Sequence, residues 1–359
     1  MFPCFCASVR CIYSARNANS GSTLRARRPG IRHAASAAIA TSSETPTTTS
    51  GSVENGRLFT MYRPVPSDSR RAGVEGPLGL MSPVRRSQEE VVIALDAASG
   101  KTIWEYRYGS PTAGADFSQG AGPHATPLLV GNRLFTAGSR REFFALDKNT
   151  GKVLWSHDLI KDYGAPSVNR GMANSPLLYN NTILLPTGGK SQALGAFNPE
   201  TGALVWKAGD VEYAPASPVL IGVDGQTQVV LFGGDRIAGM DPSNGKTLWS
   251  HPHKTDYGLN ISTPIWSPAD RLLIFSSAYG TGSRALELRQ SGGATTVVEK
   301  WALGRVRAHI GIIIPDRRHG VHVERRLRPV VSLRGQRQDR RHGLAGPRFR
   351  PRAAAICRR

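Results

Sequence analysis

Residues 142–157 read EFFALDKNTGKVLWSH and contain the pattern that predicts the fold. An apolar run reaches Ala145, Asp147 follows two residues later, and Gly151 and Trp155 follow at two further steps of four residues. The same spacing recurs in residues 91–106, 194–208 and 237–251, with Asn198 in the Asp position and Gly239 in the Ala position. Successive tryptophans lie 51, 51, 43 and 52 residues apart, at Trp104, Trp155, Trp206, Trp249 and Trp301. Self-similarity at such a period is typical of repeat architectures.

A second motif keeps the same phase upstream of the tryptophans. It is a Ser or Thr followed by Pro, and it opens an alternating apolar run, a turn and a second run. That order is typical of two short antiparallel strands. The Asp-x-x-x-Gly segment predicts a tight turn, because Asp caps it through its side chain and Gly supplies positive φ. The four copies are Thr126-Pro127, Ser175-Pro176, Ser217-Pro218 and Thr263-Pro264.

Each repeat therefore reads as four antiparallel strands with the tryptophan on the last one. A single such sheet cannot bury both of its apolar faces, whereas radial stacking of several sheets can. The prediction is an all-β fold, a β-propeller of four-stranded blades, with five recognisable blades and a divergent or truncated sixth. Residues 306–314 are expected to begin the sixth blade, but no Asp, Gly and Trp follow there in phase. The five tryptophans are expected to be structural residues, buried between neighbouring blades.

The two motifs together resemble the pyrroloquinoline-quinone-type (PQQ-like) propeller repeat over roughly residues 50–302. That family includes quinoprotein dehydrogenases, outer-membrane-protein assembly lipoproteins and many bacterial envelope proteins. The resemblance implies the propeller fold, and it leaves the activity open because one fold hosts many functions.

Composition divides the chain into three parts. The formal net charge is +20 for 359 residues. Residues 1–42 contribute +6 and residues 305–359 contribute +13, which leaves +1 for the body between them. Residues 1–49 are predicted to be a basic low-complexity tail, 50–302 the PQQ-like propeller, and 303–359 an Arg-rich tail, disordered or out of frame. A neutral body argues against nucleic-acid binding by the folded part, since counterion release needs clustered positive charge.

The tails hold the remaining compositional signals. All four cysteines, Cys4, Cys6, Cys11 and Cys357, lie outside the body, so no disulfide is expected in the core. The sequence has no apolar run of about 18 residues that would span a membrane, and no clear signal peptide. We hypothesise that the 16 arginines of residues 305–359, without one lysine, reflect a shifted reading frame. Re-sequencing this region tests that hypothesis.

Polar residues just before each Ser/Thr-Pro pair are the candidate ligand-binding residues. In a propeller the connections between blades lie at one mouth of the channel, where side chains on loops converge. Either a small-ligand site or an ordinary solvated rim fits this pattern. The candidates are His124, Arg170, Asn174, Asp256, Tyr257 and Asn260.

The sequence W-S-H followed by D-Y-G occurs twice, with His157 and Asp162 in one copy and His251 and Asp256 in the other. A His–Asp pair could serve in acid–base catalysis, but identical offsets in alternate blades favour a shared loop conformation. His251 and His253 lie two apart and could ligate a metal, although the sequence offers no third ligand. No residue is therefore assigned a catalytic or metal-binding role.

Two functions are compatible with these observations. The first is a non-catalytic propeller that binds unidentified protein partners in the periplasm or cell envelope, a location implied by the resemblance alone. This function requires no cofactor. The alternative is a quinoprotein alcohol or sugar dehydrogenase holding PQQ and Ca²⁺ in the channel, with Trp266 facing the cofactor. The candidate rim supplies only one carboxylate, Asp256, too few for Ca²⁺ and a catalytic base.

Overall fold

The computed structural model describes residues 47–48, 51–64, 87–114, 116 and 122–308, and the backbone of 313–316, 320–323 and 331–332. Blade 1 comprises β1 (Thr47–Thr48), β2 (Ser52–Glu54), β3 (Arg57–Arg63), β4 (Glu89–Asp96) and β5 (Thr102–Gly109). Blade 2 comprises β6 (Leu128–Val130), β7 (Arg133–Ala137), β8 (Glu142–Asp147) and β9 (Val153–Asp158). Blade 3 comprises β10 (Leu177–Tyr179), β11 (Thr182–Leu185), β12 (Leu194–Phe197) and β13 (Leu204–Ala208).

Blade 4 comprises β14 (Val219–Val223), β15 (Gln226–Phe232), β16 (Arg236–Met240) and β17 (Thr247–Pro252). Blade 5 comprises β18 (Ile265–Ser267), β19 (Leu272–Ser277), β20 (Gly282–Ser291) and β21 (Ala294–Leu303). A sixth, three-stranded sheet follows, with β22 (Ile313–Asp316), β23 (Gly320–Val323) and β24 (Val331–Ser332). The short helix α2 (Leu159–Tyr163) follows β9.

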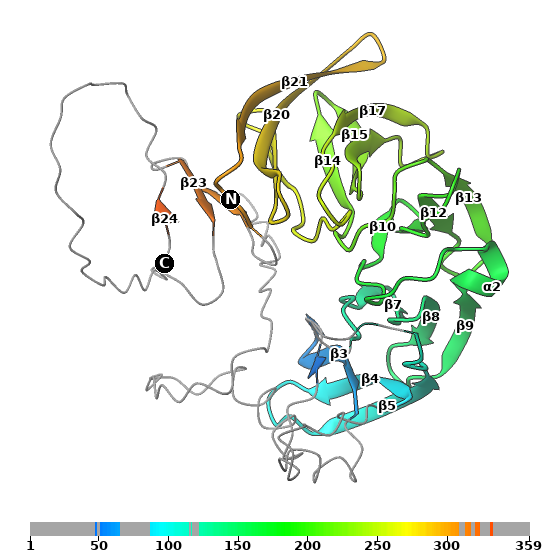
Figure 1. Ribbon diagram of the computed structural model, residues 1–359. Helices are drawn as coiled ribbons and strands as arrows, with labels where there is room; N and C mark the ends of the chain where they lie inside the picture. Colours follow the sequence, from blue (N-terminus) through cyan, green and yellow to red (C-terminus); the bar gives the residue numbers. More distant parts are fainter. Residues whose placement is uncertain are drawn as a thin grey trace, which may run out of the picture.

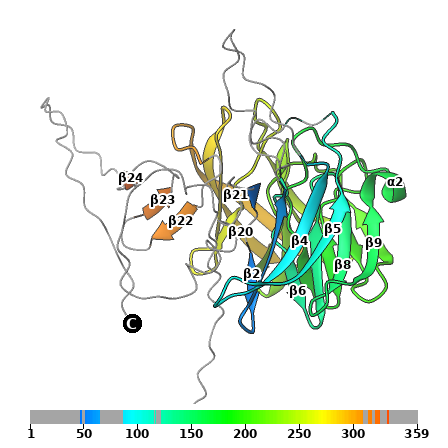
Figure 2. The ribbon, with the colours of Figure 1, turned by 90° about the horizontal axis from the view of Figure 1, so that it is seen from below.

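These sheets confirm the predicted β-propeller, with five antiparallel blades and a reduced sixth sheet. In blades 2 to 5 the strands pair in sequence order, whereas in blade 1 both β1 and β2 pair with β3. The blades follow one another around an arc, and β22 lies against β18 and β19 of blade 5 (Figures 1 and 2). The N-terminal tail before residue 47 and the four cysteines lie outside the described residues.

The Gly and Trp of the repeat meet between neighbouring blades. The Nε1 of Trp104 donates to the carbonyl of Lys148 at 3.0 Å, and a Cβ on Gly151 would lie 2.5 Å from the Trp104 ring. Trp155 repeats this arrangement one blade further, with Gly202 and the carbonyl of Pro199. The ring of Trp206 packs against Gly245 in the same way, but its Nε1 has no partner among the described residues. These three tryptophans therefore cover the tight turn of the next blade, and any side chain at the glycine of that turn would collide with the ring. Trp104 and Trp249 are buried, whereas Trp155, Trp206 and Trp301 are only partly buried.

Blades 4 and 5 depart from the repeat in a coupled way. Trp249 turns back over its own blade, where its Nε1 donates to Gln228 at 2.7 Å and its ring occupies the space that a Cβ on Gly239 would need. In blade 5 the long β20–β21 hairpin replaces the Asp-x-x-x-Gly turn and packs Leu288 and Val297 into the cluster around Trp249. Gly239 at the Ala position and the hairpin that replaces the turn of blade 5 thus both contact the reoriented Trp249 or its cluster.

The Ser/Thr-Pro motif joins neighbouring connections between blades. The backbone N–H of Thr126 donates to Oγ of Ser175 at 2.8 Å, and the N–H of Ser175 donates to Oγ of Ser217 at 3.0 Å. Because the strands of a blade alternate in direction, the turn between its second and third strands lies at the same end as these connections. We call this end the linker end. It includes residues 122–127, 164–176, 209–218 and 253–264 and the turns 138–141, 186–193, 233–235 and 278–281.

Candidate functional site

The six candidate residues lie at the linker end but in different environments. Asn174 and Asn260 are fully buried. Arg170 and Asp256 are exposed, and Nε of Arg170 lies 3.5 Å from Oδ2 of Asp116. Tyr257 is 69% exposed and its ring packs edge-on against that of Tyr279. The sixth candidate, His124, is partly buried.

The two buried asparagines fasten connections together. Nδ2 of Asn174 donates to the carbonyls of Ala214 and Ala216 at 3.0 and 2.7 Å. Nδ2 of Asn260 donates to the carbonyl of Gly233 at 2.6 Å, while the backbone carbonyl of Asn260 accepts from the N–H of Ala216 at 2.9 Å. In both side chains Oδ1 is buried without a partner among the described residues. The amides therefore hold neighbouring connections together and leave one acceptor available on each.

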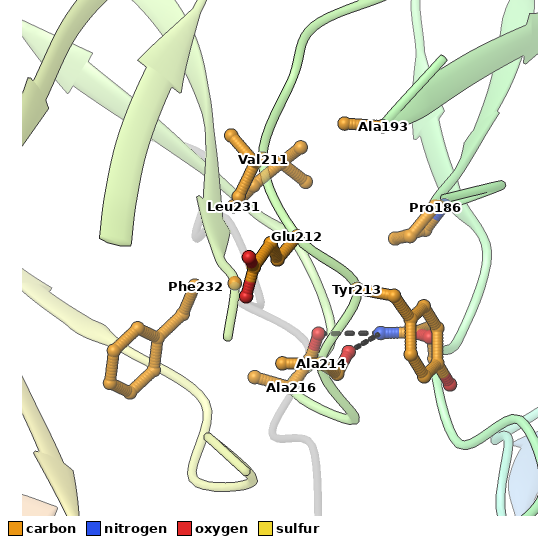
Figure 3. A pocket seen from close by; sticks show the side chains of 11 residues that line it. Pro186, Ala193, Val211, Glu212, Tyr213, Ala214, Ala216, Leu231 and Phe232 are labelled. Atoms are coloured by element: carbon orange, nitrogen blue, oxygen red, sulfur yellow. Dashed lines mark hydrogen bonds between the residues drawn. The ribbon is translucent and has the colours of Figure 1, made fainter. Parts of the chain in front are cut away.

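A small hollow lies beside Asn174, between the connection that precedes β14 and blades 3 and 4 (Figure 3). Its volume is about 260 Å³, including the solvent at its mouth. The walls are mainly apolar, with Pro186, Ala193, Val211, Leu231 and Phe232 beside the polar Asn174, Glu212 and Tyr213. Of the six candidates, only Asn174 lines this hollow.

The two W-S-H and D-Y-G copies have different contacts. In the first, His157 Nδ1 lies 3.2 Å from Oδ2 of Asp162, and its Nε2 bonds the carbonyl of Gly202 in the next blade at 2.8 Å. In the second, Nε2 of His251 lies 3.4 Å from Oε2 of Glu299. The His–Asp contact occurs in the first copy, where the imidazole also bridges two blades. This geometry fits the structural interpretation of the motif.

His253 is buried between blades 4 and 5, where its ring packs edge-on against Phe232 and Phe275 and its Nε2 lies 2.5 Å from Ser277 Oγ. Burial lowers its pKa to about 3, so the imidazole is neutral at ordinary pH. The described residues contain no group of three or more His, Cys, Asp or Glu side chains placed to hold a metal. Trp266 packs against the core cluster shared by blades 4 and 5.

Sequence reasoning missed a buried ionic network between blades 1 and 2. Nη2 of Arg63 lies 2.6 Å from Oε1 of Glu90, and both side chains are almost fully buried. Arg63 also donates to the carbonyl of Ser110 at 2.8 Å, and Tyr108 Oη donates to Glu90 Oε2 at 2.7 Å. Ser139, from the next blade, donates to Glu90 through both its N–H and its Oγ. Every oxygen of the buried carboxylate is thus satisfied, as a buried charge requires.

Repeat register could have revealed this position. Glu90 stands four residues before Ala94, and Arg141 and Gln192 stand four residues before the corresponding alanines of blades 2 and 3. All three side chains are buried at the linker end. The same place in three repeats therefore carries an acid, a base and an amide.

A second carboxylate, that of Glu142, faces this network. A Cβ on Gly138 would lie 2.5 Å from Glu142 Oε2, 2.6 Å from Tyr108 Oη and 3.1 Å from Glu90 Oε2, so three oxygen atoms converge on that glycine. Burial, and next the negative charge of Glu90, raise the pKa of Glu142 to about 7. The backbone N–H of Arg140 donates to it at 3.0 Å. That hydrogen bond lowers the pKa, but burial and Glu90 outweigh it, so the folded protein favours the protonated acid below about pH 7.

We expect the stability of the protein to fall as the pH rises toward 8. The pKa of Glu142 is higher in the folded state than its ordinary value of 4.5, so its contribution is present below pH 4.5 and is lost as the pH passes about 7. Glu142→Gln should reduce by about 1–3 kcal/mol the decrease in unfolding free energy between pH 5 and pH 8. Urea unfolding at both pH values measures this. Glu212→Gln, an exposed carboxylate at the same end, is the control, and an equal effect of both variants would refute the assignment.

The sequence of this chain is similar to one protein family and to several curated proteins. The family described as outer membrane protein assembly factor BamB matches residues 88–303. Quinoprotein alcohol dehydrogenase PedH of Pseudomonas putida is 28% identical over 166 residues, which cover 42% of this chain and 25% of the relative. Outer membrane protein assembly factor BamB of Aliivibrio fischeri is 30% identical over 61 residues, covering 17% of this chain and 16% of the relative.

Among solved structures, BamB from Moraxella catarrhalis aligns with a TM-score of 0.49 and 17% identity, covering 81% of this chain and 74% of that one. The chain spans about a quarter or less of the length of the two curated relatives. In the part of the chain that the structure describes, no helix is long and apolar enough to cross a membrane.

Proposed function

Because this chain belongs to the family of PQQ-type repeat proteins described as outer membrane protein assembly factor BamB, we propose that it is a non-catalytic β-propeller that binds proteins in the bacterial cell envelope. Membership covers residues 88–303, which include the last two strands of blade 1, β4 and β5, and all of blades 2 to 5. We propose the envelope location because the family is described as an outer membrane protein assembly factor.

A row of exposed aliphatic residues carries the proposal. The residue just before the blade tryptophan is 41% exposed at Ile103, 43% at Leu154 and 55% at Val205. These residues lie on β5, β9 and β13, the fourth and outermost strands of three successive blades. Each such strand has one backbone edge without a partner strand within its sheet. Apolar side chains beside an open edge suit an extended segment of a partner protein, which would add backbone hydrogen bonds.

The contacts at the linker end also support a non-catalytic role. Asn174 and Asn260 donate to backbone carbonyls of neighbouring connections, and His157 bridges two blades. Glu90, the most buried carboxylate there, is held by Arg63. Polar side chains in these places stabilise the packing of blades, a task that a rigid binding scaffold requires.

Photo-crosslinking from the outer strands tests the proposal. A photoreactive residue placed at Leu154 or Val205 should crosslink the same envelope protein, whereas one placed at the exposed Lys152 in the turn should not. The triple variant Ile103→Ser, Leu154→Ser, Val205→Ser should lose at least tenfold in affinity for that partner while its melting temperature stays within a few degrees. Equal crosslinking from all positions, or unchanged affinity of the triple variant, would contradict it.

The alternative, a PQQ-dependent alcohol dehydrogenase, draws its support from relatives such as PedH. Addition of PQQ and Ca²⁺ to the purified full chain, followed by quinone absorbance and dye reduction with alcohols, separates the two. Stoichiometric quinone binding with turnover would replace the scaffold proposal. The described residues offer no group of acidic side chains that fits a Ca²⁺ site.

A further inference from the structure

Arg141 is a buried cation without a carboxylate partner among the described residues. It lies in the turn between β7 and β8, its side chain is fully buried, and its backbone φ is +75°. Nη1 donates to the carbonyl of Thr187 at 2.5 Å. Nε and Nη2 are buried and have no hydrogen-bond partner in the described part of the chain. A buried charged group of this kind is destabilising unless an anion or another acceptor pairs with its N–H groups.

At the equivalent position of blade 1, the buried charged side chain has a full set of partners. Glu90 occupies the same place in the repeat as Arg141, four residues before the motif alanine. Its charge is met by Arg63, its second oxygen by Tyr108, and Ser139 adds two further donors. The fold can therefore satisfy a charge at this position, whereas in blade 2 the Nε–Nη2 edge of the guanidinium is buried without a hydrogen-bond partner among the described residues.

The unpaired Nε–Nη2 edge of Arg141 has the geometry that binds a carboxylate. Nε and Nη2 lie on the same edge of the planar guanidinium and point two parallel N–H groups in one direction, which matches the two oxygens of a carboxylate. The ring of Tyr213 lies 4.5 Å from the guanidinium carbon and fixes its plane. A Cβ on Gly188 would lie only 3.3 Å from Nη2, so the glycine keeps that side free of a side chain. Tyr213 also forms part of the wall of the hollow beside Asn174 (Figure 3).

We propose that Arg141 binds the carboxylate of a small organic acid through its Nε–Nη2 edge, in a site completed by Tyr213, Thr187 and Gly188. A positive φ at a residue other than glycine is strain of the kind that persists at binding sites. Because Arg141 is fully buried, a ligand reaches it only when the residues that cover the guanidinium shift. Association is therefore slow compared with binding at an exposed arginine.

Succinate is a suitable probe for the purified full chain. Calorimetric titration and thermal unfolding in sodium succinate, against sodium chloride of equal ionic strength, should show one bound succinate and a raised melting temperature. Arg141→Lys keeps the charge but lacks the parallel N–H pair, so we expect at least tenfold weaker binding. Arg141→Met should abolish binding. Arg140→Met, at the neighbouring arginine, is the matched control and should bind as the unaltered protein does.

Several results would overturn this assignment. Absence of binding by the unaltered protein, or full binding by Arg141→Met, would do so. If neutralising one of the acids whose side chains lie outside the described residues (Glu44, Asp68, Glu75, Asp316, Glu324 and Asp339) destabilised the protein only while Arg141 was present, the chain would supply its own carboxylate. If the Arg141 variants fail to fold, the slowly exchanging Nε–H signal of a buried arginine in ¹⁵N spectra decides, because succinate must shift it.

Discussion

Replacement of Trp104 by alanine is expected to lower the free energy of unfolding by about 3–5 kcal/mol. Trp104 is buried between blades 1 and 2, where its ring packs against Gly151 and its Nε1 donates to the carbonyl of Lys148. Removal of the ring leaves a cavity at the contact between two blades and an unpaired carbonyl group. Urea unfolding followed by circular dichroism measures the loss.

The adjacent residue on the same strand is the control. Ile103 is 41% exposed, so Ile103→Ala should change the free energy of unfolding by no more than about 0.5 kcal/mol. Equal costs for the two substitutions would show that the tryptophan does not hold the blades together. Trp206→Ala should be less costly than Trp104→Ala, because Trp206 is only partly buried and its Nε1 has no partner among the described residues.

Replacement of Arg63 by methionine is expected to cost about 3–5 kcal/mol, because it leaves the Glu90 carboxylate buried without its counter-charge. The two side chains lie 2.6 Å apart and are almost fully shielded from solvent. A large penalty is therefore expected for either single change. The double variant Arg63→Met, Glu90→Leu removes both charges and should unfold with a higher free energy than Arg63→Met or Glu90→Leu alone.

A surface pair supplies the comparison for this double-mutant cycle. Arg289 and Glu287 form an ion pair on β20 in which the arginine is largely exposed. Arg289→Met should cost less than about 1 kcal/mol, as exposed pairs usually do. If Arg63→Met cost as little, the buried network would be dispensable. If the double variant were less stable than both single variants, the uncompensated charge would not be the source of the penalty, and the prediction would be wrong.

The sequence alone allowed the prediction of the blades, because the signals that form them are local. Asp147 accepts from the N–H groups of Asn149 and Thr150, and Gly151 has a φ of +73° that other residues avoid. These interactions span four residues, so they appear as a fixed spacing in every copy.

The candidate site was less accessible to sequence reasoning. The order of strands indicates which end of each blade carries the connections, and Asn174 and Asn260 do lie there. Whether such a side chain faces solvent or fastens a neighbouring connection depends on packing between blades, which spacing does not encode. His157 and His251 illustrate this, because identical motifs contact Asp162 in one case and Glu299 in the other.

Spacing therefore predicted the succession of blades, whereas the partners of the buried polar side chains depended on contacts between residues far apart in the chain. Arg63 binds Glu90 and Ser139, which lie 27 and 76 residues away. Trp249 donates to Gln228, 21 residues away, in the cluster that also contains Leu288 and Val297 of the β20–β21 hairpin. Glu90, Arg141 and Gln192 occupy one repeat position, yet their side chains have different partners: Glu90 binds Arg63 and Ser139, Arg141 donates to Thr187, and Gln192 accepts from Lys207. The reason is physical: a turn is stabilised by its own few residues, whereas a buried charge is stabilised by whatever the fold brings to it.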